Sequence, residues 1–281
     1  MNAIEATGLR YSYPDGTLAV DGVDVTVAAG ERVALLGPNG AGKSTVLQLL
    51  GGLIEPDVGT VRYFGETTDA DAVRDRLSVL TQNPADYLFN PTVREDLRYG
   101  PAQQDLTEAE VDRRVERVAE RLDLTDLLSK PPFRLSGGQQ RRAALASALT
   151  VEPDVLLLDE PVSNVDAANR AEILALLEEL SEDGVTLVTS TPDTELVPHV
   201  ADRVVLFGAD GTVAATGTTR EILTDTRLLA DCDLRPPQVV RLFGDSEPER
   251  SEGSDSTSGS ETTREHVPLT VAEARERLGR D

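Results

Sequence analysis

The feature that most constrains the fold is a glycine-rich segment between an apolar stretch and a predicted helix. Residues 37–44 are Gly-Pro-Asn-Gly-Ala-Gly-Lys-Ser, which match the pattern G-x-x-x-x-G-K-[ST] of a phosphate-binding loop. The segment Arg32–Leu36 before it predicts a buried strand, and Ser44–Leu50 after it predicts a helix. A strand, a glycine loop and a helix in this order predict an α/β fold with a parallel sheet.

The loop is expected to bind phosphate through its backbone. Its glycines allow a tight curl in which successive N–H groups point at phosphate oxygens, and the N-terminus of the following helix adds a positive dipole end. Lys43 supplies a charge for the β and γ phosphates, and Ser44 offers a hydroxyl to Mg²⁺. The predicted nucleotide contacts in this region are Gly37, Pro38, Asn39, Gly40, Ala41, Gly42, Lys43, Ser44 and Thr45.

Strand and helix patterns alternate along the rest of the chain. Thr107 and Glu110 form a capping-box pattern at the start of a predicted helix that runs to Leu124. Asp210-Gly211 predicts a hairpin turn. The other predicted strands are Ile4–Leu9, Asp21–Val27, Gly59–Gly65, Val155–Leu158, Val185–Ser190, Arg203–Phe207 and Thr212–Ala215, and Ala167–Leu180 is a predicted helix. This alternation predicts helices on both faces of a parallel sheet.

Two adjacent acids follow one of the buried strands. Four aliphatic residues precede Asp159, so its carboxylate is expected at the carboxyl edge of the sheet, beside the phosphates. Asp159 is expected to hold magnesium through water, as in other P-loop enzymes. Glu160 follows it directly.

A second motif identifies a family. Residues 135–139 are Leu-Ser-Gly-Gly-Gln, which match the signature of ABC-type ATPases at all five positions, and the chain resembles that family over about residues 3–225. The resemblance implies a RecA-like parallel-sheet core, an N-terminal antiparallel β subdomain and an inserted helical subdomain. It also implies ATP and Mg²⁺ as cofactors, and a head-to-tail pair of ATPase subunits. The signature of each subunit would close over the ATP of the other through Ser136, Gly137, Gly138 and Gln139.

The same resemblance implies roles for single residues. Glu160 would polarise the attacking water, and Gln82 would touch Mg²⁺ and couple to a membrane partner. Asp166 matches the family within Ser163–Asp166, whereas Asn164 and Val165 depart from its pattern. The implied catalytic residues are thus Glu160, Gln82 and Asp166, and the implied metal contacts are Ser44, Gln82 and Asp159. Tyr13 matches the aromatic residue that stacks on adenine, with Tyr11 as an alternative.

Further segments resemble the ATPases of energy-coupling-factor and cobalt/nickel-type importers. They are Gln82–Phe89, Pro91–Val93, Gly100-Pro101, Arg235–Gln238 and Pro268–Ala274. The resemblance implies a peripheral protein on the cytoplasmic face of the cell membrane, bound to an integral membrane subunit. Cobalt, nickel or a vitamin would be the cargo. Tyr87, Leu88 and Phe89 could line the docking groove, or they could pack the core of the helical insertion.

One family residue is missing. Where the resemblance implies Ser-Thr-His-Asp, this chain has Ser190-Thr191-Pro192-Asp193, and Pro192 offers neither a side-chain donor nor a backbone N–H. His199 lies seven residues further on and is not expected to replace that histidine. Three explanations stay open: pairing with a different ATPase, slower hydrolysis that relies on Glu160, or a subunit that binds ATP mainly as a clamp.

Composition narrows the function classes. The chain has 50 acidic and 27 basic residues and a formal net charge of -23, which disfavours binding to nucleic acid. Only Lys43 and Lys130 are lysines, and this pattern suits the salt-rich cytosol of a haloarchaeal source. One cysteine and two histidines exclude a disulfide framework and argue against a zinc site. With no signal peptide or apolar run of spanning length, the protein is expected to stay in the cytosol.

The predicted domain organisation has three parts. Residues 1–235 form the nucleotide-binding domain, with the helical insertion at about 84–150. Residues 236–265 form an acidic, Ser/Gly-rich linker, and residues 266–281 form a short helix that Thr270 and Glu273 would cap. The rival functions are a soluble ABC ATPase for protein assembly and a largely non-hydrolytic subunit. A chromosome-organising ATPase is disfavoured because no long heptad segment interrupts the core.

Overall fold

The computed structural model describes residues 1–163, 165–244 and 267–279, and it contains two sheets. The larger sheet has six strands in the order β5-β6-β7-β3-β8-β9, and it is parallel except for its last strand. These strands are β5 (Leu77–Leu80), β6 (Val155–Asp159), β7 (Thr186–Thr191), β3 (Arg32–Leu36), β8 (Arg203–Phe207) and β9 (Val213–Thr218). The predicted hairpin is present as the antiparallel pair β8–β9.

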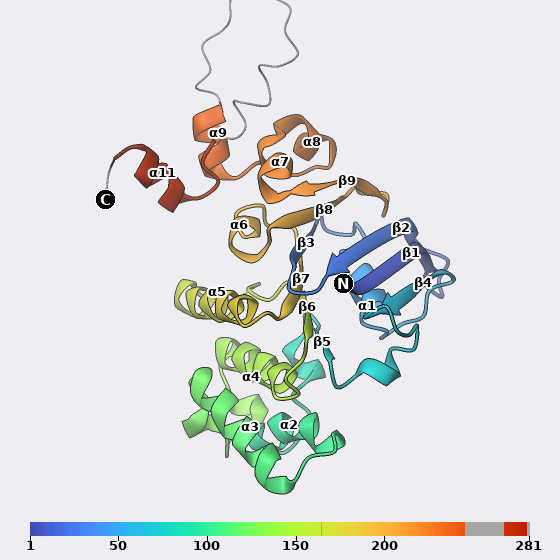
Figure 1. Cartoon of the computed structure of the whole chain (residues 1–281). Helices are drawn as coiled ribbons and strands as arrows, with labels where there is room; N and C mark the ends of the chain where they lie inside the picture. Colours follow the sequence, from blue (N-terminus) through green and yellow to red (C-terminus); the bar gives the residue numbers. More distant parts are fainter. Residues whose placement is uncertain (164, 245–266, 280–281) are drawn as a thin grey trace, which may run out of the picture.

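The smaller sheet is antiparallel and has the order β2-β1-β4. Its strands are β1 (Asn2–Ser12), β2 (Leu18–Ala28) and β4 (Val58–Tyr63). Helix α1 (Lys43–Leu50) packs between this sheet and the larger one, because its Val46, Leu47, Leu49 and Leu50 share one core with residues of both. Figure 1 shows this sheet and α1 on one side of the central strands, with α5 and α6 on the other.

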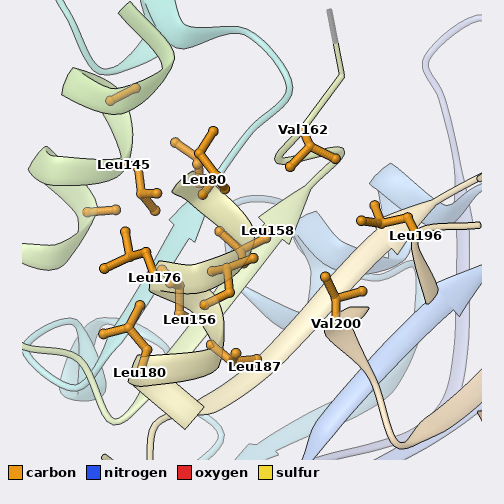
Figure 2. Close-up of a cluster of buried hydrophobic side chains, with 14 of the residues drawn as sticks. Leu80, Leu145, Leu156, Leu158, Val162, Leu176, Leu180, Leu187, Leu196 and Val200 are labelled. Carbon is orange, nitrogen blue, oxygen red and sulfur yellow. The ribbon is translucent and has the colours of Figure 1, made fainter. Parts of the chain in front are cut away.

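The alternation of side chains along the strands divides the interior into two cores. In β6, Val155 and Leu157 face the core with α1, whereas Leu156 and Leu158 face the opposite core. The latter is covered by α5 (Ala167–Glu182) and α6 (Val197–Val200). Figure 2 shows Leu156 and Leu158 beside the labelled side chains Leu176 and Leu180 of α5. Such two-sided burial explains why the first four residues of β6 are all apolar.

Three α-helices are inserted between β5 and β6. They are α2 (Val93–Tyr99), α3 (Glu108–Arg121) and α4 (Gly137–Leu149). The capping box of Thr107 and Glu110 is present at α3, and Thr92 with Glu95 forms a second box at α2. Short 3₁₀ turns join the elements of the chain at Asp71–Val73, Pro84–Asp86, Pro101–Gln103, Thr125–Leu127 and Pro132–Arg134. The predicted fold class, an ABC-type α/β core with two added subdomains, is confirmed.

The chain continues through α7 (Thr219–Thr224), α8 (Thr226–Asp231), α9 (Gln238–Gly244) and α11 (Val271–Arg277). Helix α9 differs from the prediction that a linker begins at residue 236, because its Val239 and Val240 are buried. The segment 245–265, where the acidic stretch was predicted, lies outside the described residues. The other predicted domain boundaries stay a prediction. In the described parts of the chain, no helix combines the length and apolar character needed to cross a membrane.

The predicted cap of the last helix is only half formed. The Thr270 hydroxyl accepts a hydrogen bond from the backbone N–H of Glu273 at 3.2 Å. The Glu273 carboxylate does not return this bond to Thr270, because it accepts from the backbone N–H of Leu269 and from Arg220 on α7. Arg220 also donates to the Val267 carbonyl. Helix α11 is thus attached to the nucleotide-binding domain through Arg220.

The acidic surface leads to a prediction about salt. The net charge is -23, so the excess carboxylates repel one another at low ionic strength. Arginines such as Arg32 and Arg76 pair with some of the nearby carboxylates. The melting temperature is expected to rise as KCl increases from about 0.1 M to about 1 M, because the Debye length falls from about 10 Å to about 3 Å. Thermal melts in a KCl series test this, and a flat or falling series would contradict the haloarchaeal hypothesis.

Candidate functional site

The glycine-rich loop joins β3 to α1, and two of its glycines have conformations that other residues rarely adopt. Gly40 has φ 85° and Gly42 has φ 77°. A Cβ on Gly42 would also lie 2.2 Å from the backbone oxygen of Ala19. Gly37 is needed for a different reason, because a Cβ there would lie 2.9 Å from the backbone oxygen of Phe207. The curl of the loop therefore depends on both backbone freedom and close packing.

Lys43 is the first residue of α1 and is only 6% exposed. Its Nζ donates a hydrogen bond of 2.8 Å to the Pro38 carbonyl, which holds the ammonium across the loop. Burial lowers the pKa of Lys43, and the negative charges of Glu160 and Asp159 oppose that shift. The loop therefore presents a fixed cation next to two carboxylates, and this arrangement suits a phosphate chain with a metal ion.

A cavity of about 500 Å³ opens beside this loop. Its lining includes Asn39, Gly40, Gly42, Lys43, Ser44 and Thr45 of the predicted phosphate contacts, together with Gln82, Glu160 and Pro192. The remaining predicted contacts, Gly37, Pro38 and Ala41, are not among the lining residues. Gly37 packs closely on Phe207, the Pro38 carbonyl accepts from Lys43, and Ala41 is buried. The cavity thus combines the phosphate loop with segments that follow β5, β6 and β7.

The residues expected to contact magnesium lie at one edge of the sheet. Ser44 Oγ donates to Asp159 Oδ1 at 3.0 Å, and the Ser190 hydroxyl contacts the same carboxylate oxygen. A hydroxyl and a carboxylate are hard oxygen donors, which suit Mg²⁺. Within the described residues, no group of three or more His, Cys, Asp or Glu side chains is arranged to hold a metal. The Ser44 hydroxyl and the Asp159 carboxylate fit Mg²⁺, which binds proteins through one or two carboxylates and takes substrate phosphates as further ligands.

Glu160 has an unusual backbone conformation, with φ 47° in the left-handed region. Its N–H donates to the Ser190 carbonyl at 3.1 Å, and its own carbonyl accepts a hydrogen bond from Ser163 Oγ at 3.0 Å. Its side chain lines the cavity, where Glu160 Oε2 accepts from Gln82 Nε2 at 3.2 Å. A carboxylate held in this way can accept a proton from a water molecule in the cavity.

The structure favours Tyr13 over Tyr11 as the aromatic contact. Tyr13 lines the cavity, and its hydroxyl shares a hydrogen bond of 2.8 Å with Thr45 Oγ1. Tyr11 is absent from the lining of this cavity and packs against the apolar core. Its ring meets that of Tyr13 edge-on, with centroids 5.3 Å apart. Tyr11 thus supports the Tyr13 ring, and the stacking of Tyr13 on adenine stays a prediction.

Pro192 lines the cavity where the resemblance implies a histidine. His199 lies on α6, is exposed and is not among the lining residues, so it does not replace that histidine. The neighbouring Asp193 accepts a hydrogen bond of 3.0 Å from Arg170 on α5. This hydrogen bond connects the loop after β7 to α5. The loop has no side-chain donor at position 192.

The signature motif and Asp166 lie outside this cavity. Ser136 and Gln139 form a capping box at the start of α4, and Ser136 and Gly137 are exposed. A Cβ on Gly138 would lie 2.8 Å from the side chain of Asn169. Asp166 caps α5, where it accepts from the backbone N–H groups of Ala168 and Asn169, and these bonds lower its pKa. In a single chain Asp166 therefore has a capping role, and its catalytic role stays a prediction.

Two residues of the site were missed by the sequence analysis. Ser190 contacts Asp159, and its position near the end of a buried strand was the available signal. Arg141 on α4 is buried and donates to the backbone carbonyls of Gln82 and Glu160. No short motif indicates the second residue, because its contacts come from segments about 20 and 60 positions away.

Comparison with known proteins agrees with this geometry. The sequence profile of the ABC transporter family matches residues 20–163. The chain is 42% identical over 245 residues to "Energy-coupling factor transporter ATP-binding protein EcfA" of Methanosphaera stadtmanae, covering 85% of this chain and 88% of that protein. It is 43% identical over 244 residues to "Cobalt import ATP-binding protein CbiO" of Rhodobacter capsulatus, covering 85% and 87%.

A solved structure supports the same assignment. The cbiO1 protein of Clostridium perfringens, part of the ABC transporter complex cbiONQ, superposes with a TM-score of 0.71 and 32% identity. The alignment covers 86% of this chain and 99% of that one. The chain belongs to the ABC transporter ATP-binding family. It is an ABC-type ATPase, and the nucleotide it binds is ATP.

Proposed function

We propose that this chain is the ATP-hydrolysing subunit of a membrane importer and that it acts by closing with a second ATPase subunit around ATP. The observation that carries this proposal is the separation of two nucleotide-binding surfaces. The phosphate loop and Glu160 share one cavity, whereas Ser136 and Gly137 of the signature are exposed outside it. A second subunit is needed to bring a signature to the open side of the cavity.

Residues in and beside the cavity have separate roles in this proposal. Lys43 and the loop N–H groups bind the phosphates, and Tyr13 stacks on the adenine. Ser44, Asp159 and Gln82 would hold Mg²⁺, which would supply neutralisation of phosphate charge. Glu160 accepts a proton from the attacking water, while the amide of Gln82 fixes the orientation of its carboxylate. Hydrolysis then releases the closed dimer.

The proposed cargo follows from the relatives. Two of them carry names of energy-coupling-factor and cobalt-import ATPases, and both align over most of this chain. A cobalt or nickel ion is the first proposed cargo, and a vitamin is the second. The membrane subunits would determine which of these is carried, since the cavity of this chain is built for a nucleotide. No observation on the described residues favours the soluble assembly ATPase.

An exposed aromatic pair is the proposed docking point for the membrane subunit. Phe89 and Tyr99 are 59% and 54% exposed, and their rings meet edge-on with centroids 5.1 Å apart. Tyr87 and Leu88 are packed against the core, so they fit the packing alternative considered for them. Phe89 follows the segment that begins at Gln82. A partner helix on this pair would therefore be connected to the site by only a few residues.

Removing both rings is expected to weaken binding of the membrane subunit. Truncation of an aromatic residue at an interface centre costs about 2 kcal/mol or more, so the double change of Phe89 and Tyr99 to Ala is expected to lower affinity by at least about 30-fold. ATPase activity of the isolated subunit should be retained. Val58→Ala, at a site of equal exposure on β4, is the matched control. Unchanged binding of the double variant would contradict this docking point.

The direct test of the proposed function is co-purification from native membranes in mild detergent with Mg-ATP, followed by mass spectrometry and an ATPase assay. Recovery of an integral membrane subunit together with ATP turnover would support the importer. Recovery of soluble partners alone would contradict it. Identification of a second ATPase with histidine at the position of Pro192 would indicate a heterodimer.

Pro192→His tests whether a missing contact limits turnover. Loss of one group that stabilises a transition state costs about 10²- to 10³-fold in kcat, so restoring it is expected to raise kcat by up to about 10²-fold. Pro192→Ala serves as the control, because it restores a backbone N–H without a ring donor. Steady-state ATPase kinetics of both variants would decide, and equal kcat for wild type and Pro192→His would contradict a simple missing contact.

A further inference from the structure

Arg141 is a buried cation that connects three separate segments around the cavity. It lies on α4, two residues after the signature, and is 3% exposed. Its Nη1 donates to the Gln82 carbonyl at 2.7 Å, and its Nη2 donates to the Glu160 carbonyl at 2.7 Å. Nη2 also donates to Ser163 Oγ at 2.9 Å. One guanidinium thus joins the loops after β5 and β6 to the signature helix.

Packing alone does not explain a cation at this position. The other buried residues of α4 are alanines and leucines, which fill the core without a charge to desolvate. The hydrogen bonds of Arg141 go to neutral oxygens, so they compensate burial less well than a carboxylate partner would. Burial lowers the pKa of Arg141, and the charges of Asp159 and Glu160 oppose this shift. The residue is costly to bury, and its contacts are all near the site.

Its contact with Glu160 falls where the backbone is strained. The left-handed conformation of Glu160 is unfavourable for a residue with a side chain and persists only when its surroundings fix it. The Glu160 carbonyl accepts from both Arg141 and Ser163, and Ser163 in turn accepts from Arg141. The peptide group that follows the catalytic carboxylate is therefore oriented by the guanidinium.

The planar fork of arginine suits this geometry. Its two terminal nitrogens bond carbonyls of two loops at once, with equal distances of 2.7 Å. A lysine has one nitrogen on a flexible stem and lacks the fixed fork. The side chains of Gln82 and Glu160 meet at the cavity. The guanidinium holds the backbone carbonyls of the same two residues.

We propose that Arg141 is a positioning residue that holds Gln82 and Glu160 in register with the signature helix. A movement of α4 would then be transmitted to the hydrolytic carboxylate through one side chain. This proposal rests on the proposed ATPase function of the same site. Arg141 does not line the cavity, so it acts through the residues it orients.

The test compares ATP hydrolysis and ATP binding in the full chain. Arg141→Met keeps much of the apolar volume, and Arg141→Lys keeps the charge. For both we expect kcat to fall by about 10²-fold, because a misplacement of about 1 Å at a reacting group has an effect of that size. The Kd for ATP should stay within about threefold of wild type, since the phosphate loop is untouched. If Arg141 were needed only for packing, Arg141→Met would keep the wild-type kcat. If it were needed only for its charge, Arg141→Lys would keep the wild-type kcat.

A matched control separates this effect from general destabilisation. Arg114 on α3 also donates to a backbone carbonyl and a side-chain amide, but it lies away from the cavity. Arg114→Met is expected to leave kcat unchanged. Ser163→Ala removes the second donor to the Glu160 carbonyl. It is expected to lower kcat about tenfold, because the loss of one hydrogen bond costs about 1 kcal/mol and about 1.4 kcal/mol corresponds to a factor of ten. It supplies the test if Arg141→Met does not fold.

The outcomes are distinct. Wild-type kcat in Arg141→Lys and in Ser163→Ala would overturn the positioning role, and so would a loss of ATP affinity that matches the loss of kcat. A wild-type chain that binds ATP without turnover, alone or with its partners, would overturn the proposed function instead. A low kcat with unchanged ATP affinity in the Arg141 variants, and normal kinetics in Arg114→Met, would support Arg141 as the positioning residue.

Discussion

Glu160→Gln is expected to lower ATP turnover by about 10²- to 10⁴-fold, the usual contribution of a general base. Glutamine has the same shape as glutamate, so it can keep the contact with Gln82 and the backbone bonds of residue 160. It cannot accept the proton of the attacking water. ATP affinity is therefore expected to stay close to that of the wild type, and under the proposed mechanism the closed dimer should accumulate, because there its release depends on hydrolysis.

The measurement is single-turnover hydrolysis together with size-exclusion chromatography in Mg-ATP. Glu179→Gln is the matched control, because Glu179 is an exposed acid on α5 that pairs with Arg121 away from the cavity. Wild-type turnover in Glu160→Gln would remove the proposed general base. Turnover of the wild type no higher than that of this variant would favour a subunit that acts mainly as a clamp.

Lys43→Met is expected to weaken ATP binding by about 10- to 100-fold. Hydrogen bonds to charged groups contribute about 1.5–3 kcal/mol, and about 1.4 kcal/mol corresponds to a factor of ten. The buried Nζ already lies in the loop, held by the Pro38 carbonyl, so little rearrangement is needed when phosphates arrive. Methionine keeps the length of the side chain and removes its charge.

The chain offers a clear control for this change, because its only other lysine is Lys130. Lys130 is exposed in the helical insertion and does not line the cavity. Binding of a fluorescent ATP analogue to the Lys43→Met and Lys130→Met variants measures the difference. Equal affinities in the two variants would show that Lys43 does not bind the phosphates.

The core of the site was predictable because its signals are local. Arg32–Leu36 was predicted as a strand and is β3 with the same bounds, and the loop that follows it has the conformations its glycines indicated. The strand before Asp159 was predicted from four aliphatic residues, and β6 contains them. In both cases a short run of residues determines the element, and the order of strands determines the edge at which the loops meet.

Other features depend on contacts that no local pattern contains. Arg141 could not be assigned, since its acceptors lie on two other loops. Helix α9 was placed in a linker because Pro236-Pro237 precede it, yet Val240 is buried against the core. Helix α2 was missed although Thr92 and Glu95 form the same box that predicted α3. That signal was present, but α2 is only seven residues long.

The order of the large sheet gives the two halves of the site different stiffness. Glu160 and the phosphate loop follow β6 and β3, which are each paired on both sides, whereas Gln82 follows β5, which pairs with β6 alone. Amide protons of strands paired on both sides exchange with solvent mainly through global unfolding, whereas those of an edge strand exchange through local fluctuations. Glu160 therefore follows a strand that is paired on both sides, whereas Gln82 follows an edge strand and is held to Glu160 through Arg141 and its own side-chain amide. Local opening of β5 would loosen the segment with Gln82, Phe89 and Tyr99 before the strands beneath Glu160 and the phosphate loop open.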